Sequence, residues 1–331
     1  MLNLNSKNVL LVAPNFFGYA NEIKKELELR GAQVSFLEDR PLRRSWAIAL
    51  GLVFPFLKRL AFLRLCNSFF SNDSLNFDIV LIINGESFSK KLFFDFKRRF
   101  AVAKFILYIW DNSRNKPDVF NFIKFYDVVY TFDKGDAEEY GLRFQPLFFK
   151  PFFDNNIVAK KSLYDICFVG TVHSDRYFII SKLKEHFPPN FKVFIHLYVQ
   201  APWVYWFRKL TNFPYMKSKS SDFIFQPLKK DALTELFLKS RIIIDIEHPK
   251  QEGLTFRTIE ALGAHKKLIT TNPSISSYDF YDASNIEIID RTSPRVPNSF
   301  LYSEYNPVSK DIRDRYKLSS WLDKILEEVN L

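Results

Sequence analysis

Glycine and cysteine are scarce in this chain, and long apolar runs are missing. Among 331 residues there are nine glycines and two cysteines. Cys66 and Cys167 lie far apart, so neither a disulfide framework nor a cysteine-based zinc site is expected, which suits a reducing cytoplasm. The longest apolar run, residues 46–57, contains Pro55 and is shorter than the roughly 20 residues that a spanning helix needs. We therefore expect no signal peptide and no membrane-spanning segment.

Signatures of several enzyme classes are absent as well. There is no G-x-x-x-x-G-K-[ST], which argues against a P-loop ATPase or kinase. The first predicted strand-to-helix turn reads APNFFGY rather than G-x-G-x-x-G, which argues against a dinucleotide dehydrogenase. The five histidines form no H-E-x-x-H, and no G-x-S-x-G nucleophile motif occurs. A metalloprotease and an α/β-hydrolase are therefore not expected.

Acidic residues are missing from two long stretches, although the chain as a whole is basic with a formal net charge of +10. These stretches cover residues 41–72 and 186–221, and both combine lysine and arginine with aromatic residues, most densely in 46–70 and 202–210. Such a combination favours binding to an anionic membrane surface. Two core helices with basic edges are the alternative. Nucleic acid is disfavoured, because no recognised nucleic-acid module is visible.

What is present is an alternation of apolar strands and amphipathic helices, which predicts parallel sheets. The length suits two domains, and the composition is that of a globular protein. The pattern runs once through the first half and restarts at residue 165, after a segment of linker composition at residues 150–162. We predict two tandem Rossmann-like, doubly wound α/β domains. Ligands bind at the carboxyl ends of such strands, so an interdomain cleft is expected.

The segment QEGLTFRTIEALG, residues 251–263, carries the most chemical information. If a helix begins near Thr255, the backbone N–H groups of Gly253, Leu254 and Thr255 point out of its N-terminus and form an anion site. Arg257 can add a charge-assisted hydrogen bond to a phosphate. Glu260, further along the helix, can accept both hydroxyls of a ribose. The alternative is a capped amphipathic helix with Arg257 and Glu260 facing solvent.

The run EGLTFRTIEALGAHKKLITTN resembles the donor-site segment of GT-B glycosyltransferases, with its E-x7-E spacing from Glu252 to Glu260. The wider chain is similar to a bacterial group of CgeB-like and lipopolysaccharide- or capsule-biosynthesis glycosyltransferases. The matching segments, in chain order, are FFGY, VSFLEDRP, NGESFS, YIWDN, DVVYTFDKGDAEEYGL and DICFVGTVHSDR. One departure is that Gly253 follows Glu252 directly, where the family often has Phe-Gly two residues later.

This resemblance implies roles for individual residues. It implies that Glu260 binds the ribose of a nucleotide-sugar donor. It also implies that the diphosphate is bound at the start of the helix, by the segment Glu252, Gly253, Leu254 and Thr255. Four further positions are implied around the phosphates: Gly170 and Thr171 close over them, Arg176 competes with Arg257 for the phosphate charge, and Gly18 faces them across the cleft.

Two carboxylates are candidates for the catalytic base. Glu86 and Asp111 follow successive predicted strands of the first domain, at their carboxyl ends. An enzyme that inverts the anomeric carbon needs a base within hydrogen-bond reach of the acceptor hydroxyl, whereas a retaining enzyme relies more on positioning. Either carboxylate could instead cap the next helix.

The sequence as a whole favours a cytoplasmic, metal-independent glycosyltransferase without a cofactor; no D-x-D metal motif occurs, and Asp245-Ile246-Glu247 comes closest. We expect an acceptor-side domain at 1–150, a donor domain at 163–306, and a terminal helix at 307–331 that returns to the first domain. The acceptor is expected to be a lipid-linked glycan at the inner face of the cytoplasmic membrane. A sugar-nucleotide epimerase of the same fold and a non-catalytic module that binds anionic polymers remain alternatives.

Overall fold

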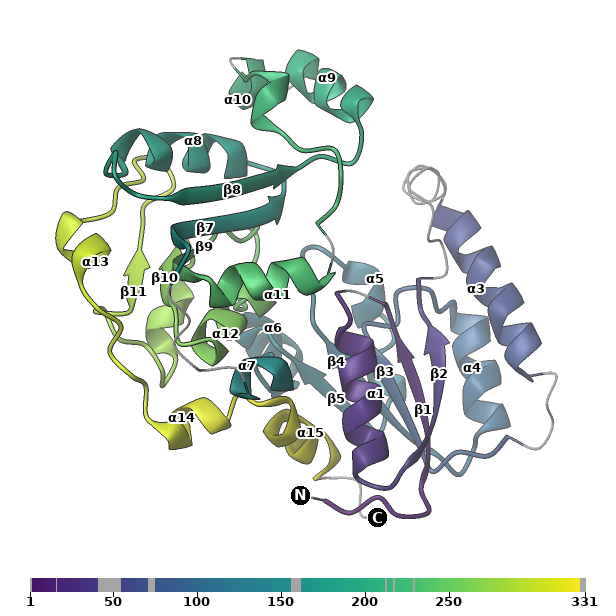
Figure 1. Cartoon of the computed structure of the whole chain (residues 1–331). Helices are drawn as coiled ribbons and strands as arrows, with labels where there is room; N and C mark the ends of the chain where they lie inside the picture. The colour runs from purple at the N-terminus through teal and green to yellow at the C-terminus, as the bar shows by residue number, and fades with distance from the viewer. Residues whose placement is uncertain are drawn as a thin grey trace. The chain divides into compact units, whose positions relative to one another are not determined.

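The computed structural model describes residues 2–15, 17–40, 55–70, 75–155, 162–211, 213–216, 218–228 and 230–327. The chain divides into two compact units (Figure 1). The first unit comprises Met1–Leu147 and Leu318–Leu331, and the second comprises Phe148–Lys317. Within the described residues, no helix combines the length and apolar character needed to cross a membrane.

The first unit is built on a six-stranded sheet with the order β2-β1-β3-β4-β5-β6, in which all paired strands are parallel. Its strands are β1 (Asn8–Ala13), β2 (Gln33–Glu38), β3 (Ile79–Ile83), β4 (Lys104–Ile109), β5 (Val128–Thr131) and β6 (Arg143–Phe144). The central strands read as continuous apolar runs such as IVLII because helices cover both faces of a parallel sheet.

The helices of the first unit are α1 (Tyr19–Leu29), α3 (Pro55–Phe70), α4 (Lys90–Arg99), α5 (Pro117–Phe120), α6 (Lys134–Tyr140), α15 (Leu318–Leu326) and the 3-10 helix η1 (Ile123–Phe125). Phenylalanines of α3 and α4 pack on one face of the sheet. Helix α15 comes from the end of the chain, and its buried Trp321 ring meets Tyr108 of β4 edge-on at 4.8 Å. Arg30, at the end of α1, donates from Nη1 to Asp323 Oδ1 at 2.7 Å.

The second unit is built on a five-stranded parallel sheet with the order β11-β10-β9-β7-β8. Its strands are β7 (Tyr164–Thr171), β8 (Val193–Tyr198), β9 (Ser240–Asp245), β10 (Lys267–Thr270) and β11 (Ile286–Ile288). Its helices are α7 (Pro151–Asn155), α8 (Arg176–His186), α9 (Pro202–Thr211), α10 (Phe213–Met216), α11 (Lys230–Leu238), α12 (Phe256–Gly263), α13 (Asn298–Tyr302), α14 (Lys310–Asp314) and the 3-10 helices η2 (Ser220–Asp222) and η3 (Pro273–Ser277).

Both sheets reverse their strand order at the first strand of the unit, which is the mark of a doubly wound fold. In the first unit β1 lies between β2 and β3, and in the second unit β7 lies between β8 and β9. The prediction of two Rossmann-like α/β domains is therefore confirmed. Ligands of such sheets bind beyond the carboxyl ends of the strands at this switch point. A ligand site is therefore expected at the carboxyl ends of β7 and β9, and of β1 and β3.

Candidate functional site

Helix α12 begins at the carboxyl edge of the second sheet, where the sequence predicted it. Thr255 is its N-cap in extended conformation, and its Oγ1 accepts hydrogen bonds from the backbone N–H groups of Arg257 (3.1 Å) and Thr258 (3.4 Å). Gly253 and Leu254 are buried, whereas Glu252 is exposed. The start of α12 is therefore fixed by its own cap, and the backbone that leads into it is held inside the fold.

A buried carboxylate at the end of β9 anchors this helix start. Asp245 Oδ2 accepts from Thr255 Oγ1 at 2.5 Å and from Thr258 Oγ1 at 2.8 Å, and Oδ1 accepts from Arg257 Nη1 at 2.7 Å. Arg257 is thus ion-paired inside the fold, and the alternative that its side chain faces solvent is wrong. Sequence reasoning missed the role of Asp245; its only signal is an acid at the end of the apolar strand SRIIID.

Glu260 is also enclosed rather than solvent-facing. Its side chain, on the second turn of α12, is only 5% exposed, and Oε1 lies 3.4 Å from Lys150 Nζ, just before α7. The capped helix of the alternative therefore exists, but Arg257 and Glu260 do not face solvent as that alternative has them. Binding of a ribose by Glu260 stays a prediction. In this structure the Glu260 carboxylate is paired with Lys150.

Gly170 and Arg176 pack against each other at the end of β7. A Cβ added at Gly170 would lie 3.0 Å from the Phe168 ring and 3.1 Å from Arg176 Nη1, so the glycine makes room for the guanidinium. Arg176 is buried and donates to the carbonyl oxygens of Ile246 (from Nε, 3.0 Å) and Thr171 (from Nη1, 2.6 Å). Burial, followed by the charge of Arg257, lowers the pKa of Arg176 to about 9. Arg176 therefore links the last residue of β7 to the residue that follows β9.

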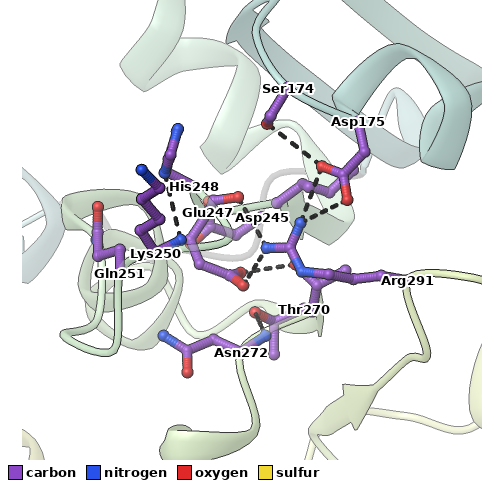
Figure 2. Close-up of polar contacts among 12 residues, drawn as sticks. Ser174, Asp175, Asp245, Glu247, His248, Lys250, Gln251, Thr270, Asn272 and Arg291 are labelled. Carbon is purple, nitrogen blue, oxygen red and sulfur yellow. Dashed lines mark hydrogen bonds and ion pairs between the residues drawn. The ribbon is translucent and has the colours of Figure 1, made fainter. Parts of the chain in front are cut away.

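A third arginine, Arg291, contacts residues that follow β7 and β9. Figure 2 shows Arg291, which follows β11, between Asp175 and Glu247. Its Nη1 donates to both carboxylate oxygens of Asp175 at 2.9 Å, and its Nη2 donates to the carbonyl (2.9 Å) and carboxylate of Glu247. Glu247 Oε2 accepts from Thr271 Oγ1 at 2.7 Å. Burial raises the pKa of Glu247 more than Thr271 and Arg291 lower it.

In the first unit, Asp39 holds the loop that carries Glu86. This loop follows β3 and contains two consecutive left-handed residues, Asn84 (φ 62°) and Gly85 (φ 69°). Asp39 is buried and accepts from the backbone N–H groups of Glu86 and Ser87, each at 3.0 Å. Burial, followed by the charge of Glu86, raises the pKa of Asp39 to about 6. Sequence reasoning did not single out Asp39, because its partners lie 47 and 48 residues further along the chain.

The two candidate bases differ in their surroundings. Burial raises the pKa of Glu86, but the charges of Arg40 and Lys116 outweigh it and bring the pKa below its usual value. Lys116 Nζ lies 2.9 Å from Glu86 Oε2, and Arg40 donates to Oε1. Asp111 accepts from the backbone N–H of Asn112 at 3.1 Å, and burial raises its pKa. The surroundings therefore favour the protonated form of Asp111 and the ionised form of Glu86.

Gly18 directly precedes α1 and has a left-handed backbone with φ of 81°. A Cβ built there meets no heavy atom within 4 Å, so the backbone conformation, rather than a close approach, is what requires glycine. Its expected place opposite the donor phosphates stays a prediction.

No protein-family model and no curated protein matches this chain. Solved structures do match over almost the whole length. A trehalose-phosphate synthase from Burkholderia vietnamiensis is 10% identical with a TM-score of 0.57, covering 98% of this chain and 96% of that one. A glycosyltransferase from Rickettsia africae is 12% identical with a TM-score of 0.57 (98% and 97%), and Anabaena Alr3699/HepE in complex with UDP-glucose is 11% identical with a TM-score of 0.56 (98% and 99%). The chain has the GT-B fold.

At these identities the similarity is one of fold. The chain spans 60% of the length of another match, a chain of the GtfA/B complex. The three structures above are matched almost end to end, so both sheets of the GT-B fold and their order along the chain are reproduced here.

Proposed function

We propose that this GT-B protein is a glycosyltransferase that moves a sugar from a nucleotide donor to a glycan acceptor. The observation that carries the proposal is the start of α12, where a capped helix N-terminus, a buried Glu260 and an arginine-rich strand edge occur together. Anabaena HepE, of the same fold, was crystallised with UDP-glucose and with UDP. A nucleoside diphosphate is therefore the donor group to test first.

Donor binding would use the main chain and side chains of the second unit. The N–H groups at residues 253–255 would receive a phosphate, and the helix dipole adds about 0.3–1 kcal/mol for a negative charge. Glu260 would accept the ribose hydroxyls beside Lys150. We expect no metal requirement, since no D-x-D motif of the metal-dependent glycosyltransferases occurs in the sequence.

Catalysis would use a carboxylate of the first unit, and Asp111 is the better candidate. Burial raises its pKa above the usual value for an aspartate and so favours uptake of the proton of an acceptor hydroxyl, whereas Arg40 and Lys116 favour the anion of Glu86. Glu86 would then position Lys116 and Arg40 rather than move a proton.

The proposal is tested by measuring the binding of UDP, GDP and CMP with two methods, thermal shift and calorimetric titration. We expect one of them to raise the melting temperature of the wild type, and Glu260→Gln to abolish most of that rise. Glu304→Gln, an exposed glutamate of the same unit, is the matched control and should respond like wild type. The proposal would be overturned if only polyanions raised the melting temperature of the protein and if that rise were the same in Glu260→Gln.

We further propose that the enzyme acts in surface-polysaccharide synthesis, that its acceptor is lipid-linked and that it docks on an anionic bilayer. The clearest support is the α9 face, formed by Trp203, Trp206, Phe207 and Leu210. These side chains recur at helical spacing and are 56–83% exposed, so α9 is not a core helix. Tyr205, on the opposite side of α9, is buried. Helices α9 and α10 lie together beyond the β8 edge of the second sheet (Figure 1).

The charge around the α9 face favours a lipid surface over other apolar partners. No acidic residue occurs from residue 186 to 221, and Lys209 Nζ lies 5.6 Å from the centre of the Trp206 ring. Exposed tryptophan beside lysine suits the interface of an anionic bilayer. The other predicted segment gives partial support: residues 46–54 lie outside the described part of the chain, but α3 exposes Phe56, Leu60 and Leu63.

Sedimentation with vesicles of phosphatidylcholine and phosphatidylglycerol tests this docking. We expect wild-type protein to sediment with anionic vesicles, less at high salt, and the double variant Trp203→Ser/Trp206→Ser to stay in solution. Leu29→Ser, which removes an exposed apolar side chain of α1, should bind like wild type. Full binding by the tryptophan variant, or a wild-type dimer that this variant abolishes, would contradict the bilayer as the partner.

A further inference from the structure

The first segment of the second unit, residues 148–155, lies along α12. Helix α7, within this segment, contacts α12 (Figure 1). Before α7, the ring of Phe148 meets the ring of Phe256, the first residue of α12, edge-on at 5.7 Å. At the other end of α12, a Cβ added at Gly263 would lie 2.5–2.9 Å from the side chain of Phe149. The segment therefore contacts α12 at both of its ends.

This segment begins where the chain passes from the first unit into the second, and it is joined to the place where the chain returns. The two boundaries fall after Leu147 and after Lys317. The backbone N–H of Phe149 donates to the carbonyl of Tyr316 at 2.9 Å, and Phe149 forms a parallel β-bridge with Lys317. Asp154 Oδ2 lies 2.8 Å from Lys317 Nζ. The two connections between the units are therefore bonded to each other inside the second unit.

Arg313 holds the same segment to the end of α12. Its Nη1 donates to Asp154 Oδ1 at 2.8 Å, and its Nη2 donates to the carbonyl of Gly263 at 2.8 Å. Its guanidinium carbon lies 4.8 Å from the centre of the Phe149 ring. These contacts do not involve Glu260, so the segment stays attached to the last residue of α12 whichever partner Glu260 has.

An ion pair links the segment to the carboxylate that we propose as the ribose ligand. Lys150 Nζ lies 3.4 Å from Glu260 Oε1, and the two side chains are 11% and 5% exposed. A strong hydrogen bond between an ammonium and a carboxylate is shorter, with about 2.7–2.9 Å between nitrogen and oxygen. The two hydroxyls of a ribose can form bonds of ordinary length to the same carboxylate. A ribose therefore competes with Lys150 for Glu260.

We propose that the Lys150–Glu260 pair is an autoinhibitory contact, which closes the ribose carboxylate in the free protein and which the ribose of a nucleotide displaces. This inference rests on the proposed function and adds to its donor site a residue that the E-x7-E segment does not contain. Displacement of Lys150 would free residues 148–155 from the middle of α12. Binding of a nucleotide would in this way be conveyed to the two connections between the units.

Removal of the lysine should therefore have opposite effects on stability and on affinity. In the free protein, loss of Lys150 leaves the buried carboxylate of Glu260 without this cation, which lowers stability. In the complex, the ribose hydroxyls replace the ammonium as donors, so the loss is smaller there. A change that destabilises the free protein more than the complex raises the affinity for the ligand. A lysine that contacted the nucleotide itself would have the opposite effect on affinity.

Calorimetric titration of Lys150→Met with UDP and with GDP tests the contact. We expect the nucleotide that binds wild type to bind this variant roughly 5- to 50-fold more tightly, within the usual range of coupling between two equilibria. The gain should be smaller with the 2′-deoxy form of that nucleotide, which offers Glu260 one hydroxyl fewer. Lys150→Arg keeps the charge and should bind like wild type. Lys182→Met removes an exposed lysine that is paired with Glu185, and as the matched control it should also bind like wild type.

Hydrogen–deuterium exchange follows the segment itself. In wild type we expect the bound nucleotide to raise exchange over residues 148–155 and to lower it at the start of α12. In Lys150→Met, exchange over residues 148–155 should be raised before any nucleotide is added, and the melting temperature of the free protein should be lower. If Lys150→Met does not fold, Lys150→Gln, which keeps a hydrogen-bond donor, replaces it and should change affinity and exchange in the same directions.

The outcomes separate this contact from the proposed function. If wild type binds no nucleoside diphosphate, both are overturned. If wild type binds one and Glu260→Gln weakens that binding, but Lys150→Met binds with equal or lower affinity than wild type, the autoinhibitory contact is overturned and the proposed function stands. Exchange over residues 148–155 that does not change when wild type binds the nucleotide would overturn the contact as well.

Discussion

Substitution of Asp245 by asparagine should destabilise the second unit strongly, although the two side chains have nearly the same shape. Asp245 is 1% exposed and accepts hydrogen bonds from Thr255, Thr258 and Arg257. Asparagine has one acceptor oxygen, and its NH2 group would face a donor. The variant would also leave Arg257 without its carboxylate partner inside the fold.

The size of the effect follows from these contacts. Breaking a buried ion pair by removing one partner costs about 3–5 kcal/mol. The Arg257 side chain is 19% exposed and can regain some hydration, so we expect a loss of about 3 kcal/mol. For a unit of this size, roughly 2–4 °C of melting temperature corresponds to each kcal/mol. The unfolding transition of the second unit should therefore fall by about 6–12 °C.

Differential scanning calorimetry of wild type and Asp245→Asn measures this shift. Asp311→Asn, an exposed aspartate of α14, is the matched control and should change the transition little. A transition within about 2 °C of wild type for Asp245→Asn would refute the claim that this carboxylate anchors the start of α12.

Three further predictions concern both units. The pKa of Asp39 is about 6 in the folded state and near 3.8 when unfolded, so the folded form binds the proton more tightly. The contribution of Asp39 to the free energy of unfolding therefore falls as pH rises from about 4 to about 6, by up to about 3 kcal/mol. In urea denaturation, the stability of wild type relative to Asp39→Asn should therefore be lower at pH 7.5 than at pH 4.5, and a difference independent of pH would contradict it. Gly263→Ala should lower the melting temperature by several degrees, because its Cβ would lie 2.5–2.9 Å from Phe149 and overpacking costs about 1–3 kcal/mol; an unchanged or higher value would refute the contact. Once a donor is known, Asp111→Asn should lower kcat by roughly 100-fold or more with donor affinity unchanged, whereas equal kcat in wild type and variant would exclude Asp111 as the base.

Much of the fold could be predicted from local sequence. Strands such as NVLLVA and IVLII are continuous apolar runs, and these indicate buried parallel strands whichever helices cover them. The start of α12 was also predictable, because a threonine before an amphipathic run is an N-cap signal that depends only on neighbouring residues. Each of these features depends on neighbouring residues only, so it can be predicted from one continuous stretch of sequence.

The electrostatics of the candidate site could not be predicted in the same way. The partner of Arg257 is an aspartate on another element, and Arg291 is paired with Asp175 across 116 positions of sequence. His173 and His248 meet only because β7 and β9 are neighbours in the sheet. These pairs depend on strand order and on side-chain direction at the sheet edge, and no spacing along the chain specifies either.

A crystal structure of the protein soaked with the nucleoside diphosphate that stabilises it tests the central claim most directly. The account predicts phosphates within hydrogen-bond distance of residues 253–255 at the start of α12, and ribose hydroxyls at the Glu260 carboxylate. A nucleotide bound elsewhere, with Glu260 still paired to Lys150 and no phosphate at the start of α12, would contradict it.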